Sequence, residues 1–257
     1  MFQNIYPIFE KKRLLKKEML ENLRDYPRTF FDIQYQNYSD GILAGCDIKG
    51  TETGLVSLPG LLRYKGVFYF LNEPYPVPCK AEGKLTYLKV HFLDRAVGIG
   101  QEEYLSRIYV DERIPDSHCE LELGRFKLQS GARLRTEYVD YYDYATEFDT
   151  MDRIHVPYAA PGKHGIWPQI LKCFSRMLTD LSVQNPWDCA FCINCLQLKE
   201  AMPYEAVRTY LNMRLGQVRE YTNEEIYGAL RRILRETGGK AEHSGQPERK
   251  EKKLLML

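Results

Sequence analysis

Hydrophobic positions recur with two different periods along this chain of 257 residues. Over residues 28–160 apolar and polar residues alternate, most clearly in 85–92, 104–110 and 119–128, as in strands with one buried face. From Pro168 onward the apolar residues recur every three to four positions, which is the period of a helix. The pattern therefore predicts an α+β fold, in which a β-rich module of antiparallel strands precedes a C-terminal helical bundle.

The beginning of the chain predicts a separate helix over residues 7–27. Apolar residues recur there at helical spacing, Pro7 suits the first turn, and Pro27 is expected to end the helix. We expect the stripe of Leu14, Leu15, Met19, Leu20 and Leu23 to face inward. The predicted regions are a helical arm over 1–27, a β-rich module over 28–164, a helical domain over 165–237 and a disordered tail over 238–257.

Four helices are expected in the bundle. The segment 188–198 is apolar nearly all round and is therefore expected to be a central helix. Gly216 is suited to the left-handed backbone that ends a helix, and Thr222 with Glu225 makes a capping box. The expected helices are 168–184, 188–198, 203–215 and 222–236.

The segment Tyr38–Leu71 has the densest turn signals of the chain. Pro59-Gly60 breaks one strand, and Lys65-Gly66 predicts a two-residue hairpin turn with positive backbone angles. The segment is expected to form a compact run of short strands.

This segment resembles the opening module of phage baseplate and tail-fibre-attachment proteins, including tail-like proteins of bacterial prophages. In that module an Asp-Gly strand is followed by a strand that ends in Pro-Gly and by a hairpin with two tyrosines. The matching residues are Asp40, Gly41, Ile42, Leu43, Gly45, Val56, Leu58, Pro59, Gly60, Tyr64, Gly66 and Tyr69. The resemblance implies a structural component of a tail-like assembly, whose partners are other tail or baseplate subunits.

Charge and composition remove several classes of partner. The 36 basic residues nearly balance the 35 acidic ones, so the whole chain has no electrostatic drive toward nucleic acid or membranes. No apolar run approaches the roughly 20 residues of a membrane-spanning helix. We expect no secretory leader from the first residues, and the seven scattered cysteines suit a reducing compartment. We expect a location in the bacterial cytoplasm or in a tail-like particle, with homo-oligomerisation left open.

Tyrosines supply the predicted contact surface. In the segment 138–144 they are interleaved with aspartates, and the hairpin over 64–71 adds further aromatic side chains. Tyrosine provides a large contact area at a small entropic cost, so these segments are expected to meet another protein. The predicted interface residues are Tyr64, Tyr69, Tyr138, Tyr141, Tyr142 and Tyr144.

Cysteines offer a competing hypothesis. Cys189, Cys192 and Cys195 have the spacing of three ligands in an iron–sulfur loop, and Cys173 is available as a fourth ligand for iron or zinc. No fourth cysteine followed by proline comes after them, and free cysteine is a preferred core residue. Core packing is the favoured interpretation, and no cofactor is expected.

Nucleic-acid binding is a further alternative. The last two helices resemble a helix-turn-helix pair that carries six arginines, although nearby glutamates dilute the positive field. A basic run over residues 11–17 is interpreted as a solvated helix face rather than a phosphate site. The arginines are Arg208, Arg214, Arg219, Arg231, Arg232 and Arg235.

Catalytic motifs give no support to an enzyme. The five histidines are scattered, and no nucleophile elbow, phosphate-binding loop or dinucleotide fingerprint occurs in the sequence. We therefore expect a non-enzymatic protein.

Overall fold

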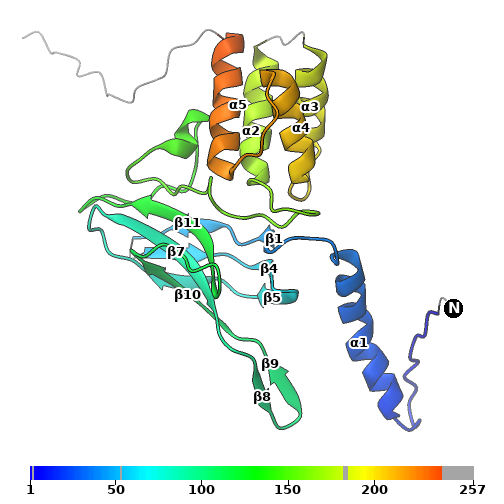
Figure 1. Ribbon diagram of the computed structural model, residues 1–257. Coiled ribbons are helices and arrows are strands. Elements are labelled where there is room, and N and C mark those ends of the chain that lie inside the picture. Colours follow the sequence, from blue (N-terminus) through cyan, green and yellow to red (C-terminus); the bar gives the residue numbers. More distant parts are fainter. Residues whose placement is uncertain (2, 53, 182–184, 239–257) are drawn as a thin grey trace, which may run out of the picture.

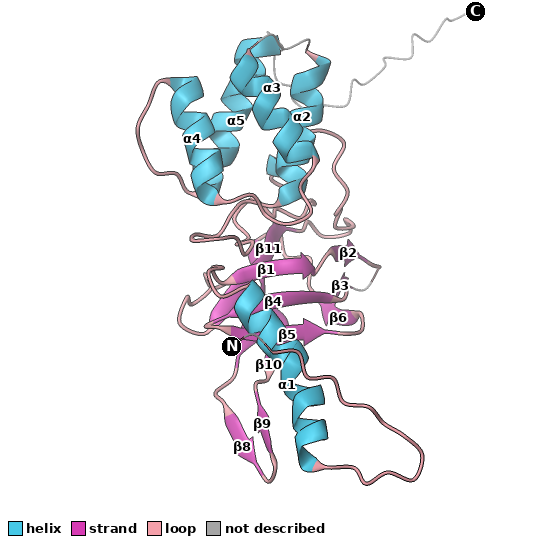
Figure 2. Cartoon of the chain, turned by 90° about the vertical axis from the view of Figure 1, so that its right-hand side faces the viewer, coloured by secondary structure: helices cyan, strands magenta, loops and turns pink. Residues whose placement is uncertain are grey.

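The computed structural model describes residues 1, 3–52, 54–181 and 185–238. A helical bundle lies at one end, a β-rich module lies in the middle, and helix α1 (Lys17–Gln34) and a long hairpin point away from the bundle (Figures 1 and 2). The structure confirms the predicted α+β class. The predicted tail over 238–257 lies, apart from Gly238, outside the described residues.

The strands are short and lie where the alternating pattern predicts them. They are grouped in three small sheets with the orders β1-β4-β5, β2-β3-β6 and β10-β7-β11, and in a separate β8–β9 hairpin. All strand pairs are antiparallel. The strands are β1 Gly41–Gly45, β2 Ile48–Gly50, β3 Gly54–Ser57, β4 Gly60–Tyr64, β5 Val67–Leu71, β6 Tyr75–Pro78, β7 Leu85–Phe92, β8 Ala96–Gly98, β9 Gln101–Glu103, β10 Ser106–Asp111 and β11 Glu120–Lys127.

Two glycines explain the geometry of β4. Lys65 and Gly66 have φ values of 48° and 79°, which confirms the predicted two-residue turn between β4 and β5. Gly60 begins β4 where the backbone of Cys46 approaches so closely that a Cβ atom would lie 2.3 Å from its nitrogen. A larger residue at position 60 would therefore separate the two segments.

The helical bundle has its own core. It contains α2 Pro168–Asp180, α3 Pro186–Leu196, α4 Tyr204–Leu215 and α5 Asn223–Gly238. The capping box is confirmed, since the Thr222 amide donates to Glu225 and the Glu225 amide donates to the Thr222 hydroxyl. Gly216 ends α4 with a left-handed φ of 64°. Trp167 packs against both this core and the core of the β-rich module, so the two parts are joined at that residue.

The predicted N-terminal helix is wrong in both of its ends. Helix α1 spans Lys17–Gln34 and runs through Pro27, which lies inside it. The basic run therefore precedes the helix and reaches it only at Lys17. Every residue of α1 is at least partly exposed, so the expected inward stripe does not enter a core. The sequence shows an amphipathic row but not whether another element covers it.

Helix α3 is also placed differently from the prediction. It was expected at the centre of the bundle, but Trp187, Ile193 and Leu196 remain exposed on it. The central positions belong instead to residues of α2 and α5, such as Ile170 and Leu230, which are fully buried. The outer face of α3 is thus apolar and uncovered by any described residue.

Candidate functional site

The predicted hairpin tyrosines lie largely inside the molecule. Tyr64 is buried, stacks on Phe92 with ring centroids 3.8 Å apart, and donates its hydroxyl to the Ser117 carbonyl. Tyr69 is half-buried against the same phenylalanine. Tyr64 therefore packs in the β core, and its predicted role as an exposed contact is corrected.

The segment Tyr138–Tyr144 also packs inward. Tyr141 and Tyr144 are buried in the helical core, and Tyr138 stacks on Tyr144 at 4.2 Å. Tyr142 is half-buried beneath the guanidinium of Arg231. The interface predicted on this segment is wrong for Tyr141 and Tyr144, because their rings fill the space between the β-rich module and α5.

The cysteines do not converge. Cys192 and Cys195 are buried, whereas Cys189 is exposed on another side of α3. Burial raises the pKa of Cys192 to about 11 and that of Cys195 to about 12, which favours the neutral thiol over the thiolate that binds metals. Among the described residues, no three His, Cys, Asp or Glu side chains are grouped as metal ligands would be.

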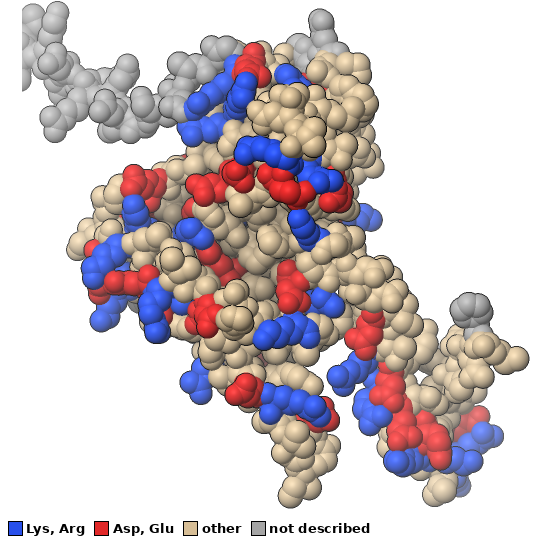
Figure 3. Space-filling view, in the orientation of Figure 1, with Lys and Arg blue, Asp and Glu red and all other residues tan. Residues whose placement is uncertain are grey.

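The arginines of α4 and α5 are engaged within the protein. Arg208 pairs with Glu205 and Glu220, and Arg214 reaches the buried Asp188 at 3.0 Å. Figure 3 shows both signs of charge interspersed over the visible face. The further pairs are Arg219 with Glu225 and Arg232 with Glu236. These contacts oppose the phosphate-binding role considered for the two helices.

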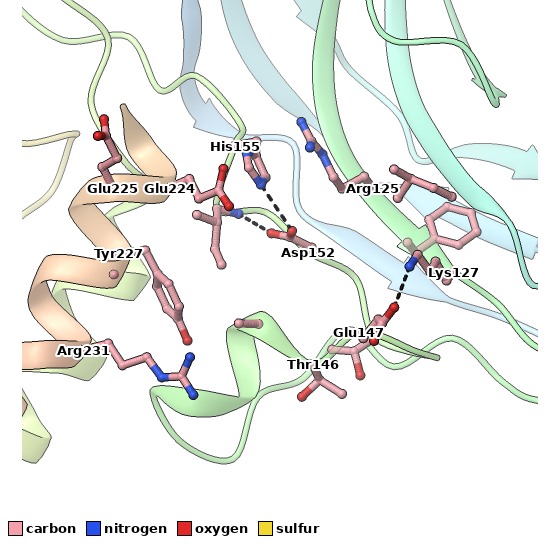
Figure 4. A pocket seen from close by; sticks show the side chains of 16 residues that line it. Arg125, Lys127, Thr146, Glu147, Asp152, His155, Glu224, Glu225, Tyr227 and Arg231 are labelled. Atoms are coloured by element: carbon pink, nitrogen blue, oxygen red, sulfur yellow. Dashed lines mark hydrogen bonds and ion pairs between the residues drawn. The ribbon is translucent and has the colours of Figure 1, made fainter. Parts of the chain in front are cut away.

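A cavity of about 550 Å³, lined in part by charged residues of both signs, lies between β11 and the beginning of α5 (Figure 4). Lys127 pairs with Glu147 at 2.6 Å, and His155 lies 3.6 Å from the Asp152 carboxylate. Burial raises the pKa of Asp152, and the hydrogen bond from the Ile154 amide opposes that shift. Both pairs join residues of the β-rich module, and the α5 side of the cavity adds Glu224, Glu225 and Arg231.

The β8–β9 hairpin, which we call the finger, is the most exposed apolar feature of the β-rich module. It stands away from the body, and its tip is free of charged side chains in Figure 3. Val97 and Ile99 at the tip have exposed fractions of 71% and 108%, while Arg95 pairs with Glu102 at its base. An apolar tip on a paired, projecting hairpin is suited to contact with another protein.

A second apolar surface lies on the bundle. A groove of about 510 Å³ runs between α3 and α4 and is lined mainly by apolar side chains, including Trp187, Leu198 and Met213. More than half of the Trp187 side chain is exposed. Large aromatic and methionine side chains of this kind are enriched in protein interfaces.

Both surfaces are apolar in the sequence, but hydrophobic periodicity alone does not show that they are exposed. Val97-Gly98-Ile99-Gly100 combines two glycines, which favour a turn, with two β-branched apolar residues. The all-round apolar character of α3 was interpreted as burial. On the finger and on α3 alike, the apolar side chains remain exposed and form a surface that another protein can cover.

Comparison with known proteins gives only distant similarity. No family model and no curated protein matches the chain. A chain of the type VI secretion system TssK–TssF–TssG baseplate subcomplex is 8% identical with a TM-score of 0.43, covering 90% of this chain and 99% of that one. TssK itself is 7% identical with a TM-score of 0.41, covering 93% of this chain and 73% of TssK. At such low scores neither match supports a conclusion about function. No described helix is both long and apolar enough to cross a membrane.

Proposed function

We propose that this chain is a non-enzymatic structural adaptor of a phage-like tail or baseplate assembly and acts through contacts with other proteins. The finger is the observation that carries this proposal. Its tip presents Val97 and Ile99 to solvent at the end of a hairpin, where they remain largely exposed. A partner that covers apolar residues in such a place removes them from water, which stabilises the complex.

The groove between α3 and α4 gives the adaptor a second contact. The finger and the bundle lie at opposite ends of the molecule (Figure 1). A chain with apolar surfaces at two ends is suited to connect two neighbours, which is what an adaptor does. The β-rich module lies between them (Figure 1).

The kind of assembly follows from the resemblance of Tyr38–Leu71 to the opening module of baseplate and tail-fibre-attachment proteins. Its glycines have a structural role here, because Gly41, Gly45 and Gly60 each lie where a Cβ atom would collide with neighbouring backbone. The partners proposed are therefore tail or baseplate subunits encoded near the gene for this chain.

A binding experiment tests this function. The purified chain is titrated against each tail or baseplate protein encoded next to its gene, together with the variant Val97→Asp/Ile99→Asp and the control Val218→Asp. Val218 is also an exposed valine, but it lies in the loop between α4 and α5. One subunit should bind the wild type and the control alike, and the finger variant about tenfold or more weakly. Equal binding of all three proteins, or turnover of a substrate by the chain, would contradict the proposal.

A further inference from the structure

Helix α1 carries an apolar row with the spacing of a coiled coil. Met19, Leu23, Tyr26, Phe30 and Ile33 follow one another at intervals of four, three, four and three residues. The mean interval of about 3.5 residues keeps a row facing a neighbouring helix along its whole length. We call this row the seam.

The seam points away from the body of the molecule. Leu23, Phe30 and Ile33 each expose more than half of their side chains. The face that holds α1 to the β-rich module is a different one, where Phe31 contacts Phe68 and Phe70 of β5 at ring distances of 5.6 and 6.1 Å. Helix α1 is thus anchored by one face and leaves the other free for a partner.

Helix α1 also needs stabilisation that the described residues do not supply. Pro27 removes one backbone hydrogen bond from its interior, and none of the residues 17–34 is buried. Most helices in proteins are stabilised mainly by the packing of their apolar face. A partner on the seam would provide that packing.

The charges beside the seam indicate which partner fits. The positions that flank a coiled-coil seam are occupied by uncharged residues, and the charged residues of α1 lie farther round the helix. Two identical helices therefore meet without repulsion between like charges. The flanking residues are Leu20, Asn22, Pro27, Thr29 and Gln34.

We propose that the seam packs in parallel and in register against the seam of a second copy of this chain. In this arrangement each residue of the row meets its own counterpart, and both β-rich modules lie at the same end of the paired helices. The contact joins copies of the chain and does not involve the finger, so it stands or falls separately from the proposed function.

Sedimentation of the full chain tests the contact. Wild type should sediment as an oligomer at micromolar concentration, and Leu23→Glu/Phe30→Glu should weaken association by about 100-fold or more. Val97→Glu/Ile99→Glu adds the same charges to the finger and should leave the oligomer intact. Cooperative thermal unfolding of both variants shows that they fold, and the seam variant should unfold at a lower temperature because it loses the stabilisation by association. A monomeric wild type, or an oligomer unaffected by the seam charges, would overturn the proposal.

A mixing experiment tests the register. Leu23→Glu and Leu23→Lys should each be monomeric, and their mixture should form mixed oligomers, because residue 23 meets residue 23 only when the helices are parallel and in register. Failure of the mixture to associate would overturn the parallel arrangement.

Discussion

Tyr141 and Tyr227 form a reciprocal pair across the junction between the β-rich module and helix α5. Each hydroxyl donates to the backbone carbonyl of the other residue, at 3.0 Å from Tyr141 and 2.8 Å from Tyr227, and the two rings stack with centroids 4.8 Å apart. The side chain of Tyr141 is fully buried. This pair holds the loop before the 3-10 helix Tyr142–Ala145 against the bundle.

Removing these hydroxyls should destabilise the protein. Tyr141→Phe is expected to lower the free energy of unfolding by about 1 kcal/mol, because one buried hydrogen bond is lost. Tyr141→Ala should lower it by about 3–5 kcal/mol through the cavity that it leaves. Chemical denaturation measures both values, and Tyr142→Phe, which removes the hydroxyl of a half-buried tyrosine, is the control. If Tyr141→Ala lowers the free energy of unfolding by only a few tenths of a kcal/mol, the side chain is not buried in the junction.

The same residue predicts a pH dependence. Burial, and then the neighbouring Tyr227, raise the pKa of Tyr141 well above its usual value of 10.0. Its contribution to stability is therefore constant below pH 10 and falls as the pH rises above it, because only the unfolded chain ionises there. The loss is about 1.4 kcal/mol per pH unit for this group. Unfolding free energies at about pH 8, 10 and 11 should show a smaller decrease for Tyr141→Phe, and identical slopes would contradict this account.

Asp188 is the centre of a buried ionic cluster in the bundle. Its side chain is 1% exposed and accepts hydrogen bonds from the Tyr210 hydroxyl at 2.9 Å and from Arg214 at 3.0 Å. Asp188→Ala should destabilise the protein by about 3–5 kcal/mol, since it leaves Arg214 without its partner. Glu236→Ala breaks an exposed pair with Arg232 and should change stability by less than about 1 kcal/mol. Similar values for the two variants, measured by denaturation, would refute the difference in burial.

Two glycines should respond oppositely to alanine. Gly60→Ala is expected to disrupt the β-rich module, because the added methyl group collides with the Cys46 backbone. Gly228 lies within α5, and a Cβ atom there meets nothing within 4 Å. Gly228→Ala should therefore stabilise the protein by about 0.5–1 kcal/mol. Melting temperatures that change in the same direction would contradict the backbone geometry.

The elements that depend on local signals were predictable from the sequence. The capping box of Thr222 with Glu225, the Lys65-Gly66 turn and strand β7 each depend on residues close together in the chain. Long-range packing was not predictable. The partner of Tyr141 lies 86 residues away, so its burial leaves no mark in the tyrosine-rich segment itself.

The exposed surfaces were missed for a related reason. Periodicity identifies an apolar face but not what covers it, and the rows on α1 and α3 were both expected to face a core. The glycines at positions 98 and 100 favour a turn, but the projection of the finger from the body depends on how β7 and β10, which flank it in the chain, are packed. A sequence therefore predicts elements more readily than the surfaces between molecules.

The most direct test of the adaptor function is whether the chain is part of an assembled particle. Tail-like particles are purified from the source cells, the chain is identified by mass spectrometry, and its position is determined by electron microscopy. The account predicts that the chain is present in the particle at a fixed stoichiometry and that its finger contacts a neighbouring subunit. The Val97→Asp/Ile99→Asp variant should not be incorporated into the particle. Particles that assemble fully without the chain, or that contain it with the finger in solvent, would contradict the account.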